Sequence, residues 1–153
     1  MQIEVSRVSA DGLEFEGEED ASILELQPAD NLTPEGPVRY RVTAQVLKPR
    51  LIVHGEVEAP LRGECSRCGG FFSTLVRDPA FLRDYLLQDG QKEVDITPDL
   101  REAILLQLPA NPLCAESCAG VCPKCGSNLN EGPCECRPSS DGGRWGALDG
   151  LRL

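Results

Sequence analysis

The chain has 153 residues, of which 41% are hydrophobic, and carries a formal net charge of -10 at pH 7. This length suits one domain of ordinary size, or a domain with a small appended module, and allows a buried core. The N-terminal residues lack the basic and apolar regions of a secretory leader, and no apolar run approaches the roughly twenty residues of a membrane span. The composition therefore argues against a membrane-spanning protein and predicts a cytoplasmic one.

The charge is distributed unevenly along the chain. Residues 1–35 carry ten acidic side chains and one basic side chain, whereas residues 36–77 carry seven basic and three acidic ones. A segment with excess positive charge can approach phosphate groups even when the whole molecule is acidic. Two interpretations stay open, namely a nucleic-acid contact within residues 36–77 or a solvated surface with a chance cluster of basic residues.

The clearest structural pattern lies in the middle of the chain. In "VRYRVTAQVL" (38–47) and in "LIVHGEVEAPL" (51–61), apolar and polar residues alternate, which is typical of strands with one buried face. The short "KPR" segment between them predicts a hairpin connection. Lys48 and Arg50 are expected at its exposed tip.

Further strands are predicted on either side of this hairpin. Short strands are expected at "IEVS" (3–6) and "ASILEL" (21–26), and a longer one at "FFSTLV" (71–76). The segment "CSRCGG" (65–70) would then occupy the turn that precedes the last of these strands. The segment "PAFLRDYLL" (79–87) fits either a helical face or a strand, because its length and its apolar spacing allow both.

A helix is predicted over residues 98–108. Thr97 can serve as its N-cap, Pro98 suits the first helical position, and Pro109 ends it. Four apolar residues fall on one face of this helix: Leu100, Ile104, Leu105 and Leu108. The predicted fold class is therefore α+β, with a mainly antiparallel curved sheet or partial barrel, one amphipathic helix and a C-terminal cysteine-rich zinc module.

Eight cysteines carry the strongest functional signal in the sequence. A structural zinc ion takes four ligands in a tetrahedron, and a C-x2-C turn brings two thiolates to one metal. Such turns occur at "CSRC" (65–68) and at "CPKC" (122–125). Disulfides are rare where thiols are kept reduced, so metal binding is favoured. The predicted ligands of one or two structural zinc ions are Cys65, Cys68, Cys114, Cys118, Cys122, Cys125, Cys134 and Cys136.

The spacing allows more than one partition of these cysteines. The partition that requires least of the chain joins Cys65 and Cys68 to Cys114 and Cys118, and Cys122 and Cys125 to Cys134 and Cys136. However, the two side chains of a C-x-C pair face opposite ways in an extended chain, so Cys134 and Cys136 could be divided between sites. Cys118 and Cys122 could also face a single metal from one helical turn.

The sequence contains no motif that indicates an enzyme. It lacks G-x-S-x-G, a P-loop and G-x-G-x-x-G. Its single histidine, His54, falls on the polar side of its predicted strand and is expected at the surface, not at a metal. Sites made of four cysteines have no open position for water, so the predicted zinc is structural. The remaining alternative is a thiol oxidoreductase that uses Cys65 and Cys68.

Four segments form a compound signature. They are "CSRCGG" (65–70), "EVDITPDLREAILLQLPANPLC" (93–114), "CAGVCPKCGSNLNEGPCEC" (118–136) and "DGGRWGALDGLRL" (141–153). Together they resemble the YceD family, the large ribosomal RNA subunit accumulation proteins of bacteria and plastids, over residues 38–153. The resemblance implies a non-enzymatic factor required for accumulation of 23S ribosomal RNA, acting in its processing or in large-subunit assembly.

These observations predict two parts of the chain and one mechanism. Residues 1–109 are expected to form the β-rich domain, and residues 110–153 the zinc module, with a tail anchored on it by Trp145. Ribosomal RNA is the expected partner, with its phosphates contacted by basic residues. These residues are Arg39, Arg41, Lys48, Arg50, Arg62, Arg67 and Arg77. The alternative is a zinc-stabilised adaptor whose acidic surface holds a basic ribosomal protein or assembly factor.

Overall fold

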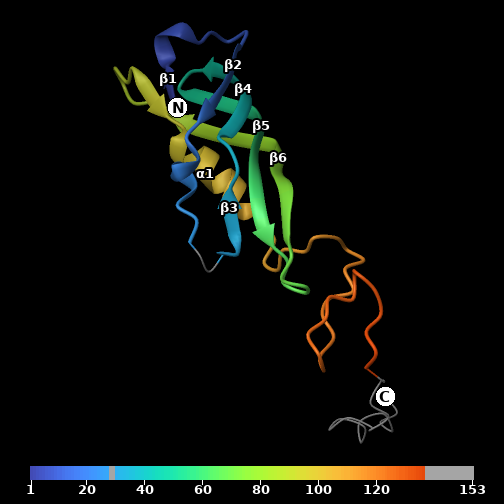
Figure 1. Ribbon diagram of the computed structural model, residues 1–153. Coiled ribbons are helices and arrows are strands. Elements are labelled where there is room, and N and C mark those ends of the chain that lie inside the picture. The colour runs from blue at the N-terminus through green and yellow to red at the C-terminus, as the bar shows by residue number, and fades with distance from the viewer. Residues whose placement is uncertain (28–29, 137–153) are drawn as a thin grey trace, which may run out of the picture.

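The structure, a computed structural model, describes residues 1–27 and 30–136. Its described elements follow the chain as β1 (Gln2–Glu4), η1 (Val5–Arg7), β2 (Leu13–Glu19), η2 (Ala21–Leu24), β3 (Leu32–Pro34), β4 (Val38–Leu47), β5 (Arg50–Glu64), β6 (Phe71–Leu86), β7 (Glu93–Asp95) and α1 (Thr97–Leu106), where η marks a short 3-10 helix. Figure 1 shows the sheets and α1 at one end of the molecule and the cysteine-rich segment at the other. No helix in the described part of the chain is long and apolar enough to cross a membrane.

The predicted hairpin in the middle of the chain is confirmed. Strands β4 and β5 pair antiparallel from Arg39 opposite Glu58 to Leu47 opposite Arg50. Val42 is buried on one face of β4, whereas Arg39 and Arg41 are exposed on the other. The alternation in the sequence therefore separates a core face from a charged face of the sheet.

Strand β6 resolves the ambiguous segment at residues 79–87. It runs without interruption from Phe71 to Leu86 and pairs antiparallel with β5 along its length, with a register shift between Gly55 and Val57 of β5. Phe81 is buried while Leu82 is 59% exposed, which is the alternation of a strand and not of a helix.

The main sheet is open. Its strands are ordered β2-β4-β5-β3, and β6 pairs with β5 on that strand's other side. Strand β5 reaches from β4 to β3, because its first part pairs with β4 and its last residues pair with β3. Among the described residues β2 pairs only with β4, and β6 only with β5, so the sheet does not close and the predicted partial barrel is not confirmed.

The N-terminal segment differs from the prediction. Of the strand expected over residues 3–6, only the first two residues lie in β1, and the chain continues as the 3-10 helix η1. The segment "ASILEL" contains the 3-10 helix η2 where a strand was expected, because Asp20 caps it and Glu25 takes a left-handed conformation with φ 48°. Leu24 on this helix is buried against the core. Strand β2, in which glutamates alternate with Leu13, Phe15 and Gly17, is a further difference from the prediction.

Helix α1 is present but shorter than expected. It begins at Thr97 and ends at Leu106, and its N-terminal flank is Ile96. Thr97 is not the cap; its backbone N–H and its hydroxyl instead donate to Oδ1 of Asp95, at 2.9 and 2.7 Å. After Leu106 the α-helical hydrogen bonding gives way to a 3-10 type bond, in which the N–H of Gln107 donates to the carbonyl of Ile104 at 3.0 Å.

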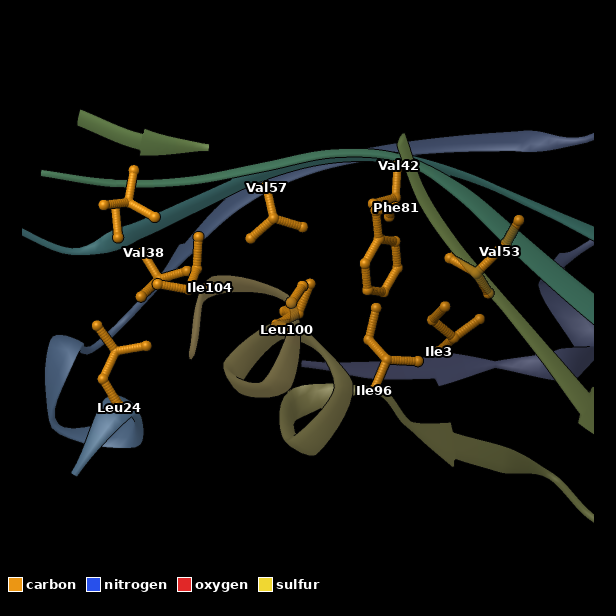
Figure 2. Close-up of a cluster of buried hydrophobic side chains, with 14 of the residues drawn as sticks. Ile3, Leu24, Val38, Val42, Val53, Val57, Phe81, Ile96, Leu100 and Ile104 are labelled. Carbon is orange, nitrogen blue, oxygen red and sulfur yellow. The ribbon is translucent and has the colours of Figure 1, made fainter. Parts of the chain in front are cut away.

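The core lies between the main sheet and α1. Figure 2 shows side chains from the sheet, among them Val57 and Phe81, facing Leu100 and Ile104 of the helix. A polar contact at the margin of this core joins α1 to β6. The Tyr85 hydroxyl donates to Oδ2 of Asp99 at 2.6 Å, and Arg83 Nε lies 3.0 Å from Asp99 Oδ1. Burial and the hydrogen bond to Asp99 raise the pKa of the Tyr85 phenol.

Replacing Tyr85 by Phe is expected to lower the free energy of unfolding by about 1.5 kcal/mol, because a half-buried hydrogen bond to a carboxylate is lost. Urea unfolding followed by circular dichroism measures this loss. Tyr40→Phe is the matched control, because the Tyr40 hydroxyl makes no hydrogen bond among the described residues. An equal loss in both variants would contradict a specific contribution from the Tyr85–Asp99 contact.

Candidate metal centres

The structure brings the eight sulfur atoms into two groups of four. The first group is Cys65, Cys68, Cys114 and Cys118, and the second is Cys122, Cys125, Cys134 and Cys136. Within each group, all Sγ atoms lie within 4.8 Å of one another. Cys134 and Cys136 therefore lie in one group, and Cys118 and Cys122 lie in different ones. This grouping is the partition that requires least of the chain.

The sulfur distances fit a tetrahedral metal better than disulfides. Sγ of Cys65 lies 3.8 Å from that of Cys118, and Sγ of Cys68 lies 3.8 Å from that of Cys114. Four sulfurs at roughly 2.3 Å from a central ion are about 3.8 Å apart, whereas a disulfide needs about 2.05 Å. All eight cysteines are free thiols. The donor set and its spacing are compatible with two metal ions.

The two C-x2-C turns share one backbone geometry. The Cys65 N–H donates to the carbonyl of Gly70 at 2.9 Å, and the Gly69 N–H donates to the carbonyl of Cys65 at 2.8 Å. The second turn repeats both bonds, from Cys122 to Ser127 at 2.8 Å and from Gly126 to Cys122 at 2.8 Å. Gly69 and Gly126 adopt φ of 69° and 75°, which L side chains rarely adopt. The glycine after each knuckle thus permits the turn.

Hydrogen bonds favour the thiolate form of part of each group. Backbone N–H groups, first that of Cys114, lower the pKa of Cys65 to about 6. The Ser127 hydroxyl lowers that of Cys125 to about 6. A thiolate disfavours a second negative charge beside it, so Cys118 raises the pKa of Cys114 to about 12. Each group thus concentrates negative charge that a cation would neutralise.

The first cysteine group joins the end of the β5–β6 hairpin to the segment after α1. The Ser66 N–H donates to the carbonyl of Pro112 at 2.8 Å. Nη1 of Arg67 donates to the carbonyls of Glu116 and Cys118 at 3.2 and 3.3 Å. These bonds hold the two halves of the group together.

Residues 110–136 bury little apolar surface. Cys118 and Cys122 are the two members of the buried hydrophobic set that lie within this range, and Val121 is 43% exposed. All members of the hydrophobic core cluster lie before Pro112 in the chain. The cysteine-rich segment therefore has almost no core other than its sulfur groups.

Three of the predicted RNA-contacting arginines lie in a charge ladder on the exposed face of the main sheet. One row of the ladder crosses four strands, from Glu18 to Arg39, Glu58 and Arg77, with ion-pair distances of 3.1, 4.0 and 2.8 Å. A second row places Arg41 3.1 Å from Glu16 and 3.6 Å from Glu56, and Glu14 lies 3.9 Å away. These arginines already face carboxylates, which outnumber them.

The other four basic residues lie apart from this ladder. Arg50, after the β4–β5 turn, pairs with Asp84. Lys48, in that turn, has no carboxylate partner among the described residues. The Arg62 guanidinium lies 4.7 Å from the ring centroid of Phe71, which is 67% exposed, and Arg67 bonds the carbonyls of the first group. The seven residues therefore do not form one basic patch.

Two further residues were singled out in the sequence, His54 and Trp145. His54 is exposed on β5 and belongs to neither cysteine group. Trp145, with the tail expected to pack on the module, lies outside the described residues.

Fold and site together define an antiparallel sheet protein with one helix and a cysteine-rich module that can bind metal. Residues 82–152 match the family model of the large ribosomal RNA subunit accumulation protein YceD. The resemblance to the YceD family is thereby confirmed.

Two of the relatives that the chain matches carry the same family name. The chain is 40% identical over 62 residues to the large ribosomal RNA subunit accumulation protein YCED homolog 1, chloroplastic, of Arabidopsis thaliana, covering 40% of this chain and 19% of the relative. It is 38% identical over 50 residues to the same homolog of Zea mays, covering 32% and 17%. It is 33% identical over 97 residues to the uncharacterized protein Rv2926c of Mycobacterium tuberculosis, covering 54% and 47%. The matches thus span less than half of each relative, and no solved structure matches.

Proposed function

We propose that this chain is a non-enzymatic factor that supports accumulation of large-subunit ribosomal RNA by binding that RNA during its processing or assembly. The observation that carries the proposal is the family match, which begins in β6 and includes the six cysteines from Cys114 to Cys136. The names of the plant relatives support the same role.

Zinc is the metal that best suits the two groups in this proposal. Four thiolates at tetrahedral spacing suit zinc, and the two groups contain no histidine or carboxylate. A closed site has no position for a reacting water, so zinc would contribute folding energy and not catalysis. In this role the chain's own groups, such as Arg67, align the cysteines on the end of the β5–β6 hairpin.

We place the RNA contact on the seven basic residues of the segment 36–77. Of these, Lys48 and Arg62 are expected to contribute most to phosphate binding, because neither has a carboxylate partner among the described residues. The ladder arginines would have to give up an ion pair with a carboxylate to bind a phosphate, which reduces their contribution to the free energy of RNA binding. The acidic N-terminal strand β2 would then limit indiscriminate binding to nucleic acid.

Charge reversal tests the RNA contact. Lys48→Glu and Arg62→Glu are each expected to weaken binding to 23S ribosomal RNA fragments and to reduce the slope of log affinity against log salt by about one, because one phosphate contact is lost. Titrations at several salt concentrations measure both quantities. Lys92→Glu is the control, with the same charge change at an exposed site beside β7. If all three variants behave alike, the contact lies elsewhere.

The charge ladder favours a second candidate function, an adaptor for a basic ribosomal protein or assembly factor. Five glutamates of the ladder face three arginines, so its exposed face is net acidic. Under this alternative, purification after nuclease treatment recovers a basic protein bound to the chain, and Glu16→Lys with Glu18→Lys abolishes its binding. Under RNA binding, nuclease treatment removes the partner.

A further inference from the structure

One side chain connects the two cysteine groups. Asn130 lies in the second group's loop, between Cys125 and Cys134, and its Nδ2 donates to Sγ of Cys118 in the first group at 3.3 Å. Its Oδ1 accepts from the backbone N–H of Ala119 at 2.8 Å, and Nδ2 also donates to Oδ1 of Asn128 at 2.8 Å. The amide has a partner for each donor and for its acceptor, which fixes its orientation.

The backbone around Asn130 is held by the second knuckle. The N–H of Leu129 donates to the carbonyl of Gly120 at 2.8 Å, and Val121 forms an isolated antiparallel bridge with Asn128. These contacts flank Cys122 and Cys125, whose turn a metal ion would hold. The contact between Asn130 and Cys118 therefore requires that the backbone of the second group is folded as in this structure.

We propose that Asn130 couples the two metal centres, so that metal at the second group increases the affinity of the first group for metal. This inference rests on the proposed zinc binding. An N–H donor stabilises a metal-bound thiolate, and such outer contacts change metal affinity by roughly 10- to 100-fold. By linkage, metal at the first group increases the affinity of the second by the same factor.

The coupling is measured as the ratio of two Zn²⁺ affinities of the first group. One is measured in the full chain, and the other in a variant whose second group is disabled by Cys122→Ser and Cys125→Ser. Competition with a chromophoric chelator gives both values. The expected ratio is about 10 to 100 in favour of the full chain.

The variant Asn130→Asp tests the hydrogen bond to Cys118. It keeps an oxygen for the N–H of Ala119, but it removes the donor to Cys118 and to Asn128 and adds a negative charge, so the ratio is expected to fall to about one or below. Asn111→Asp is the matched control. It makes the same change three residues before Cys114 in the chain, at a side chain without a hydrogen bond among the described residues, and should keep the ratio.

Each outcome bears on a different claim. A ratio of one in the unmodified chain, or a ratio that Asn130→Asp leaves unchanged, overturns the coupling alone. Absence of Zn²⁺ binding at both groups overturns the proposed zinc binding and the coupling with it. The visible spectrum of Co²⁺ at the second group is expected to be the same with and without Asn130→Asp. Its loss would make Asn130 a structural part of that group and would overturn the coupling role.

Discussion

Removal of metal by a chelator is expected to unfold residues 110–136 while the main sheet stays folded. The reason is the distribution of apolar surface: the core cluster lies before residue 110, and the cysteine-rich segment has little buried besides Cys118 and Cys122. Apparent binding free energies of structural zinc are on the order of 10 to 16 kcal/mol per site at neutral pH, which such a segment cannot replace by packing.

Amide hydrogen exchange measures this effect along the chain. With chelator, protection is expected to disappear at Cys118, Cys122, Gly126 and Leu129, whose N–H groups donate within the module. Protection in β4 and β5 should persist, because their pairing does not involve the cysteines. Protection of the module that is the same with and without chelator would contradict a metal-dependent fold.

The second large effect is expected at Phe81, which is 1% exposed and lies at the centre of the core between β6 and α1 (Figure 2). Phe81→Ala removes an aromatic ring from a closely packed site and should lower the free energy of unfolding by about 3 to 5 kcal/mol. Leu82→Ala, at the next residue and 59% exposed, should change it by less than about 0.5 kcal/mol.

This pair of variants also tests the conformation of residues 79–87. On a helix Phe81 and Leu82 could share one apolar face, and both substitutions would then be costly. On strand β6 they face opposite sides. Urea unfolding of the metal-loaded protein gives both values, and a comparable loss at the two positions would contradict the strand.

The sequence predicted those features that depend on local pattern. The β4–β5 hairpin followed from alternation, and the two cysteine groups followed from the knuckle spacing together with the shortest connections. Helix α1 was predicted because Pro98 and the apolar spacing agree, but Thr97 was assigned as the cap. Ile96 occupies the cap position instead, and Thr97, in the first turn, donates to the Asp95 carboxylate.

The features that the sequence did not predict depend on long-range pairing. Strand β2 was missed because its glutamates resemble a solvated acidic segment, although Leu13, Phe15 and Gly17 alternate with them. Those glutamates lie opposite Arg39 and Arg41 only through the β2–β4 register. The contact of Asn130 with Cys118 could likewise not be predicted from the sequence, since it depends on how the two cysteine groups lie side by side.

Metal content and thiol accessibility, measured together on protein purified without added zinc, test whether both cysteine groups hold a metal ion. We expect two Zn²⁺ ions per chain by native mass spectrometry, and eight thiols that resist alkylation until a chelator is added. Fewer than two bound ions, or thiols that alkylate at the same rate with and without chelator, would contradict two structural metal centres in the cysteine-rich module.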